Sequence, residues 1–232
     1  MTLEEDLSAE VSKFVMRTIQ KLEKLEADKM ISEATINPFL VKALGMDLNS
    51  LARFYVYQHI GRSLVTSFGM TVMESMVKSL KGGERGEWWD ISDLVNDDKH
   101  YYISIKSGPR DMDKDQLVEF ARRVAILKRR RPNATPIIAM CYGKGPLGAI
   151  APTLKKKGLD PTQTTLTGKK LYETLTGHPY YYKYLMKVVG NAALTALANV
   201  KVVDKIEEKV TQMACSFERK YKTVDKLLLA LF

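Results

Sequence analysis

The sequence predicts an α/β protein, or α+β in looser classification, with a strand–strand–helix–strand core between helical ends. Two β-prone apolar runs flank a polar turn within 87–107, and a continuous apolar run follows at 135–143. Long stretches before and after these runs place apolar residues three and four positions apart. The first pattern is typical of strands and the second of amphipathic helices. This order of elements indicates one sheet covered by helices.

The N-terminal third is expected to be helical. Residues 3–27 carry an apolar stripe at helical spacing, and the proline-containing segment SEATINPF then makes a turn. The stretches 48–61 and 67–81 are expected to form two further helices. Ser67 is the expected cap of the second, and the glycine-rich segment KGGERG ends it.

The central elements are a hairpin, a helix and a buried strand. The hairpin spans about 87–107, with its turn at 96–99. Helical periodicity resumes over 111–130, and the segment TPIIAMCYG at 135–143 is an apolar run bounded by proline and glycine. Such a run is typical of a strand buried on both faces.

The rest of the chain is expected to be loop-rich over 143–168 and helical from 169 to the end. Three regions are predicted from these elements. Residues 1–66 form an N-terminal helical region for dimerisation and DNA grip, 67–145 form a catalytic core, and 146–232 form a C-terminal region packed on that core.

The composition favours a polyanionic partner. The chain has 36 Lys and Arg against 27 Asp and Glu, a net charge of +9, which suits nucleic acid first and an anionic membrane second. A basic surface without a particular partner is the alternative.

The two cysteines, Cys141 and Cys215, lack the spacing of a zinc site or a disulfide scaffold. With neither a signal peptide nor a membrane-length apolar run, a cytoplasmic protein is expected.

Each strand of the hairpin carries one charge that a buried strand rarely holds. If the turn is centred on the Asp97–Asp98 peptide, Asp90 lies opposite Ile105, and Ser104 and Lys106 share one face. A carboxylate at this place can hold Mg²⁺, and a neighbouring lysine can lower the pKa of a water or stabilise phosphoryl charge. The alternative is a cross-strand salt bridge.

The flanking helices add polar groups. Glu74 lies in the segment SFGMTVME, where Gly69 permits close backbone approach, and it offers a second carboxylate for a hydrolytic Mg²⁺ site. A solvated helix-face charge is the alternative. The following segment, SGPRDMDKDQ, is rich in donors suited to phosphate, although each could be ordinary surface. These donors are Ser107, Arg110, Lys114 and Gln116, with Arg122 and Arg123 farther along the same helix.

An Asp followed about fifteen residues later by (D/E/S)-x-Lys on a hairpin, between a Glu-bearing helix and another helix, resembles the PD-(D/E)XK nucleases. The segments SEATINPF, SFGMTVME and ISIKSGP, within residues 30–145, resemble more closely a type II restriction endonuclease subgroup that cuts GGNCC-containing sites. The resemblance implies a mixed central sheet flanked by helices. It also implies a Mg²⁺-dependent homodimer that cuts both strands of double-stranded DNA at a short palindrome, within a restriction-modification system.

The resemblance assigns roles at the hairpin. Asp90 matches the metal-binding Asp, Lys106 matches the Lys that activates or orients the attacking water, and the carbonyl of Ile105 is expected at the metal. Asp93 is a lower-ranked rival of Asp90, since it points to the opposite face of the strand.

Ser104 stands where the nucleases usually carry a second acidic residue. Serine supplies no carboxylate, so another residue must complete the site. The resemblance offers Glu74 from the preceding helix as first choice and Glu119 from the following helix as second.

Base recognition is expected from the segments SGPRDMDK and KGGERG, with Asn37 of SEATINPF as a further DNA-binding residue. The basic segment KRRRP at 128–132 is either a nucleic-acid patch or a basic helix end. The tyrosines of HPYYYKY at 178–184 either stack on bases or seat a helix. A structure-selective or repair nuclease and a non-enzymatic DNA-binding protein remain the alternative functions.

Overall fold

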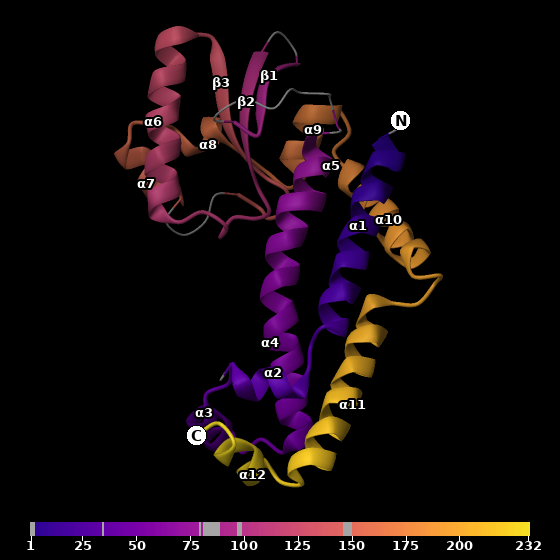
Figure 1. Cartoon of the computed structure of the whole chain (residues 1–232). Helices are drawn as coiled ribbons and strands as arrows, with labels where there is room; N and C mark the ends of the chain where they lie inside the picture. Colours follow the sequence, from indigo (N-terminus) through magenta and orange to yellow (C-terminus); the bar gives the residue numbers. More distant parts are fainter. Residues whose placement is uncertain (1–2, 34, 79, 81–88, 97–98, 146–149) are drawn as a thin grey trace. The chain divides into compact units, whose positions relative to one another are not determined.

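The computed structural model describes residues 3–33, 35–78, 80, 89–96, 99–145 and 150–232 (Figure 1). The chain forms two compact units. The sheet unit comprises residues 1–10 and 68–190, and the helical unit comprises 11–67 and 191–232. The predicted regions 1–66, 67–145 and 146–232 are defined by function. They stay a prediction, because the two compact units are defined by contacts within the fold. None of the described helices is long and apolar enough to cross a lipid bilayer.

The sheet is four-stranded and mixed, as the predicted fold class requires. Its strands are β1 (Ile91–Asn96), β2 (Lys99–Lys106), β3 (Ala134–Met140) and β4 (Thr165–Thr167). They lie in the order β1-β2-β3-β4, with β1 antiparallel to β2 and the other neighbours parallel. The hairpin and the strand after it are therefore confirmed. The strand β4 lies in the stretch expected to be loop-rich, because three residues are too short a run to produce a periodic signal.

The register of the hairpin follows the prediction only in part. Leu94 pairs with Tyr101, which is the expected register, but the ladder then shifts and Ile91 pairs with Ile103. Such a shift is the mark of a β-bulge, which adds one residue to one strand. The paired residues end at Ile91, and Asp90 meets Ile105 through its side chain, which accepts a hydrogen bond from the Ile105 amide. The turn residues Asp97 and Asp98 lie outside the described residues.

Helices α6 (Lys114–Arg130) and α7 (Ile150–Lys156) lie against one face of the sheet (Figure 1). Leu117 and Phe120 of α6 and Leu154 of α7 pack in one buried cluster with Tyr102 and Ile138 of the sheet. The helix predicted over 111–130 begins three residues later than expected. The reason is that the Asp113 side chain accepts a hydrogen bond of 2.8 Å from the Gln116 amide and caps the first turn.

The two helices predicted before the hairpin are one continuous run. Helix α4 (Leu48–Phe68) passes without a break into the π-helix η1 (Gly69–Met73) and then into α5 (Glu74–Lys78). The predicted interruption after residue 61, with Ser67 as a cap, is therefore wrong. Gly61 costs only about 1 kcal/mol inside a helix, and the segment KGGERG lies outside the described residues.

The sheet unit is completed by α8 (Pro161–Thr164) and α9 (Lys169–Thr176), followed by α10 (Tyr181–Ala196), which ends in the helical unit. The other helices are α1 (Leu3–Glu23), α2 (Ala27–Ser32), α3 (Pro38–Ala43), α11 (Val202–Tyr221) and α12 (Val224–Leu229). The core of the helical unit joins residues from both chain ends, among them Met30, Leu51, Phe217 and Leu227.

Candidate active site

The carboxylate of Asp90 is fixed by the backbone of the neighbouring strand. Asp90 directly precedes β1, and its Oδ2 accepts a hydrogen bond of 2.6 Å from the amide of Ile105 on β2. The Cys141 amide donates to the Lys106 carbonyl at 3.0 Å, so the main chain of Lys106 faces β3. Because successive residues of a strand alternate, the amide and carbonyl of Ile105 face the side of Asp90. The two oxygen donors expected at a metal therefore lie on the same side of β2.

Ser104 and Lys106 share one face of β2, as their alternation predicts. Both line a cavity of about 330 Å³ under helix α6, together with Gln116, Glu119 and Arg123 of that helix. The cavity thus gathers residues from two segments that were expected to act together, the end of β2 and the start of α6.

Glu119 is held by two arginines in this cavity. Its Oε2 accepts from Arg122 Nε at 2.8 Å, and its Oε1 accepts from Arg122 Nη2 at 2.8 Å and Arg123 Nε at 3.0 Å. The hydrogen bonds from Arg122 and then Arg123 lower the pKa of the Glu119 carboxyl to about 2. Glu119 is therefore an anion at neutral pH, and a metal ion would compete with guanidinium groups for both of its oxygens.

Glu74 opens helix α5 immediately after the π-helix η1, and α5 contacts strand β2. A π-turn inside a helix is rare and is frequently found at functional sites. The expected close approach at Gly69 is present, since a Cβ at that position would lie 2.5 Å from Oγ of Ser107. Glycine there lets η1 lie directly against the chain that follows Lys106.

Asp115 is a cavity residue that the sequence analysis passed over. It lines the same cavity as Ser104 and Lys106. The signal was present in the sequence, because Asp115 lies four residues before Glu119 and residues at this spacing share a helix face. Asp115 is therefore a further carboxylate near the serine that replaces the usual acidic residue.

The donor set fits Mg²⁺ by its chemistry. Within the described residues, no three His, Cys, Asp or Glu side chains are grouped closely enough to hold a metal ion. Mg²⁺ commonly uses one or two carboxylates, keeps several waters and binds substrate phosphates. The fixed carboxylate of Asp90 and the backbone carbonyl of Ile105 are consistent with this mode of coordination. The ion pairs of the described part of the chain do not join Asp90 to Lys106.

Most of the predicted DNA-binding residues surround the start of α6. Arg110, Lys114 and Gln116 are exposed there, and the half-buried Ser107 accepts a hydrogen bond of 3.2 Å from the Tyr142 amide through its carbonyl. Asn37 belongs to the helical unit, where its side chain caps α3 by accepting from the amides of Phe39 and Leu40. The segment KGGERG falls outside the described residues.

A mixed sheet flanked by helices, with acidic and basic side chains on adjoining strands, is consistent with the fold of a restriction endonuclease. The sequence matches the family model described as type II restriction endonuclease EcoO109I over residues 2–196, and the chain therefore belongs to this family. No individually curated protein matches the chain.

Membership of this family establishes a site-specific deoxyribonuclease, which hydrolyses phosphodiester bonds in DNA. Enzymes of this type generally use a divalent metal ion. The predicted restriction endonuclease is thus confirmed over the repair nuclease and the non-enzymatic DNA-binding protein.

Proposed function

We propose that the enzyme makes a Mg²⁺-dependent double-strand cut, with Asp90 and the Ile105 carbonyl as metal ligands and Lys106 beside the attacking water. The observation that carries this assignment is the hydrogen bond from the Ile105 amide to Asp90, next to the strand position of Lys106. When bound, Mg²⁺ supplies a Lewis acid for the phosphoryl oxygen and lowers the pKa of its water. The Lys106 ammonium stabilises negative charge on the phosphoryl group.

Glu74 completes the ligand set in this proposal, in place of the carboxylate that Ser104 lacks. The choice over Glu119 is supported by the arginine contacts at both Glu119 oxygens. Glu119 then orients Arg122 and Arg123, and Arg123 faces a phosphate of the substrate from the cavity wall. Arginine is well suited to this role because its planar fork matches phosphate oxygens.

The recognition site is proposed to contain GGNCC, and the base-reading and positioning residues are the exposed donors near Lys106 together with Asn37. Arg110 is the strongest candidate for direct readout, since arginine pairs with both major-groove acceptors of guanine. Ser107, Lys114 and Gln116 supply the remaining contacts from the same segment. In this proposal the enzyme is cytoplasmic and cuts foreign DNA, and a cognate methyltransferase protects the host DNA.

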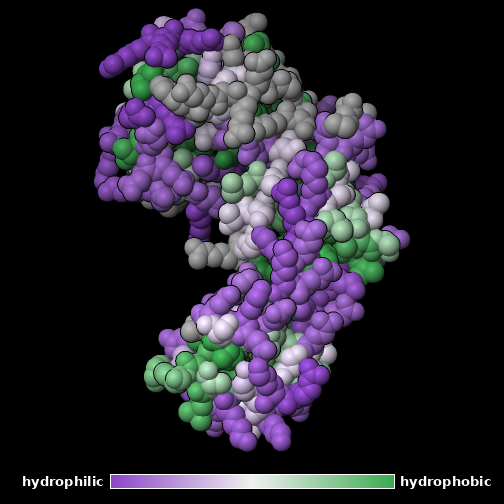
Figure 2. All heavy atoms as spheres, in the orientation of Figure 1, coloured by the Kyte–Doolittle hydropathy of each residue, from purple (hydrophilic) through white to green (hydrophobic). Residues whose placement is uncertain are grey.

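A homodimer is proposed, because a palindrome presents two equivalent strands related by a twofold axis. Helices from both chain ends carry an exposed apolar patch in the helical unit, formed by Phe39 and Leu44 near α3 and by Leu229 and Phe232 at α12. Phe39 is 75% exposed and Phe232 87%, and their rings meet edge to face at 6.4 Å. Figure 2 shows hydrophobic side chains gathered over these two helices. Contiguous exposed patches of this kind mark protein interfaces.

The proposal is tested by incubating the purified enzyme with long unmethylated DNA, with Mg²⁺ or with EDTA, and sequencing all new ends. Discrete Mg²⁺-dependent fragments that share one GGNCC-containing palindrome are the expected result. Fragments sharing a different sequence would reject the recognition site alone. A smear without common ends, or an absence of cutting in Mg²⁺, would reject the proposed reaction.

A further inference from the structure

The parallel strands end at one edge of the sheet, and this carboxyl edge begins at Lys106. Lys106 on β2 is paired with Met140 on β3, and Met140 is paired with Thr167 on β4. The Gly168 amide then donates to the Met140 carbonyl at 2.9 Å, which continues the pairing past the strand. Residues that follow β3 and β4 therefore emerge beside the residues that follow Lys106.

Two glycines bring the chain after β3 against the chain after β4. Gly143 and Gly168 have φ angles of +109° and +50°, which favour glycine, and a Cβ at Gly168 would collide with the Gly143 carbonyl oxygen. The next residue in each segment is a lysine, Lys144 or Lys169. Both lysines line one cavity of about 610 Å³ at this edge.

The ring of Tyr180 contacts Lys169 and a third lysine, Lys183. The ammonium groups of Lys169 and Lys183 each lie 4.8 Å from the ring centroid of Tyr180, which is 57% exposed. An aromatic face attracts a cation through its quadrupole and carries no net charge. The ring therefore positions two ammonium groups without neutralising them, which leaves both available to an anion.

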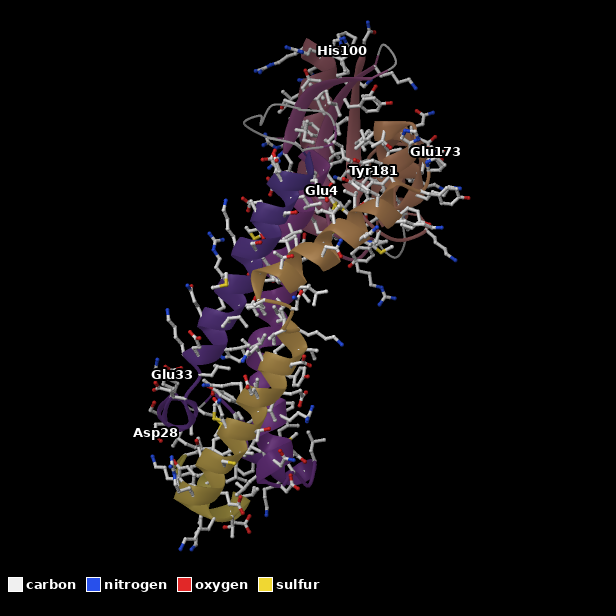
Figure 3. The ribbon with its side chains drawn as sticks, turned by 90° about the vertical axis from the view of Figure 1, so that its right-hand side faces the viewer. Glu4, Asp28, Glu33, His100, Glu173 and Tyr181 are labelled. Carbon is white, nitrogen blue, oxygen red and sulfur yellow. The ribbon has the colours of Figure 1, made fainter. Side chains whose placement is uncertain are left out.

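The other basic segment lies at the opposite edge of the sheet. Residues 128–132 end helix α6 and lead into β3 at Ala134, which pairs with His100 near the start of β2. Figure 3 places His100 at the far end of the sheet from Glu173 of α9 and Tyr181 of α10. Arg131 here donates to the Tyr102 hydroxyl at 2.6 Å. The basic segment 128–132 thus lies at the other edge of the sheet from Lys106, whereas Lys144 and Lys169 follow the strands that end beside Lys106.

We infer that Lys144 binds phosphates of one DNA strand beside the cut, together with Lys169 and Lys183, whose ammonium groups contact the ring of Tyr180. The inference rests on the proposed function, because it takes Lys106 to mark the cutting site. Two strand spacings separate β2 from β4, about 10 Å. One strand of B-DNA carries a phosphate about every 3.4 Å along the helix axis, so an edge of this length faces more than one phosphate. The repeating anions of DNA and these lysines are complementary in charge.

The test is the salt dependence of binding to duplex DNA in EDTA, where no cutting occurs. The triple variant K144Q/K169Q/K183Q is compared with a control, K128Q/R129Q/R130Q, that removes the same charge from the opposite edge. Each lost phosphate contact should lower the slope of log K against log salt by about 0.9. We expect a fall of about 2 to 3 in the triple variant and less than about 1 in the control. Equal slopes in the parent and the triple variant, or a larger fall in the control, would overturn the inference.

Tyr180 gives a second readout that depends on its ring. Tyr180→Phe keeps the cation–π contacts and should retain the parental slope, whereas Tyr180→Ala should lose part of it. Equal slopes in the two variants would remove Tyr180 from the inference.

Cutting by the parent in Mg²⁺ tests the proposed function separately. If the parent cuts and the triple variant binds with an unchanged salt slope, the phosphate assignment alone is wrong. If the parent fails to cut and the slope falls as expected, the proposed function alone is wrong.

Discussion

The Asp90 carboxylate accepts a hydrogen bond of 2.6 Å from the backbone amide of Ile105. This contact joins the chain just before β1 to β2 beyond the bulge, where the ladder of the hairpin has ended at the Ile91–Ile103 pair. A side chain thereby replaces a backbone partner. Its carboxylate is held in place by the sheet itself, which is the kind of preorganisation that a charged catalytic group requires.

Asp90→Asn should abolish cutting while leaving the fold intact. The amide oxygen of asparagine can still accept from Ile105, so the free energy of unfolding should change by about 1 kcal/mol or less. The lost negative charge should lower the cutting rate at least about a hundredfold. Single-turnover cleavage and urea unfolding measure the two quantities. Parental cutting in the variant would remove Asp90 from the site.

Lys106→Ala should lower the cutting rate at least about a hundredfold, because the ammonium that stabilises phosphoryl charge is lost. Lys99→Ala is the matched control, since Lys99 is an exposed lysine at the other end of the same strand. We expect the control to cut DNA at the parental rate. Comparable losses in the two variants would indicate a general charge effect and contradict the assignment of Lys106.

Glu74→Gln and Glu119→Gln should fail in different ways. Loss of a metal ligand should raise the Mg²⁺ concentration needed for half-maximal cutting by about tenfold or more. We expect this shift for Glu74→Gln and not for Glu119→Gln, whose carboxylate is occupied by Arg122 and Arg123. A Mg²⁺ titration of the cutting rate measures it, with Asp115→Asn as a third variant. A larger shift in Glu119→Gln would reverse the order of the two candidates.

The pH dependence of Glu119 is a further prediction. Its pKa lies near 2 in the folded protein, below the ordinary value of 4.5, because Arg122 and Arg123 donate to the ionised form. A folded-state pKa below the unfolded one stabilises the protein above the unfolded pKa, and this stabilisation is lost as pH falls toward 2. Glu119 should therefore remain ionised at every pH above about 3, as an NMR carboxyl titration would show. Arg122→Ala should raise the midpoint toward 4.5.

Phe39→Ser combined with Phe232→Ser should convert the proposed dimer to a monomer, because both exposed rings leave the apolar patch. Sedimentation measures the outcome over a range of protein concentrations. Val65→Ser is the control, since Val65 is 70% exposed in the same unit and lies on another helix. A dimer that persists in the double variant would place the interface elsewhere.

Much of the fold is readable from local patterns. The alternating hairpin, the amphipathic helix α6 and the apolar strand β3 each carry their own signal within a few residues. Features that depend on neighbours in space were missed. The bulge near Asp90 arises from how β1 meets β2, and α4 continues past Gly61 with Leu64 partly buried against the same core as Ile60.

The candidate site shows the same limit. The spacing of Asp90 and Lys106 is a local feature, and Ser104 and Lys106 line one cavity, in agreement with the shared strand face that their spacing predicts. The arginine contacts of Glu119 lie within α6, at spacings of three and four residues, and are a local feature of the helix. That Asp115 and Glu119 line a cavity with Ser104 and Lys106 depends on how α6 lies on the sheet.

The contact between Gly143 and Gly168 has a consequence for sequence drift. Two separate demands, a positive φ and the room taken by a carbonyl oxygen, fall on Gly168 together. Every missense change in its codon adds a side chain and so violates both at once. The neighbouring lysines carry no such demand, and an arginine could replace either without moving the backbone. The side chains at this edge can therefore change while the backbone stays in place, whereas position 168, which holds the two segments together, accepts glycine alone.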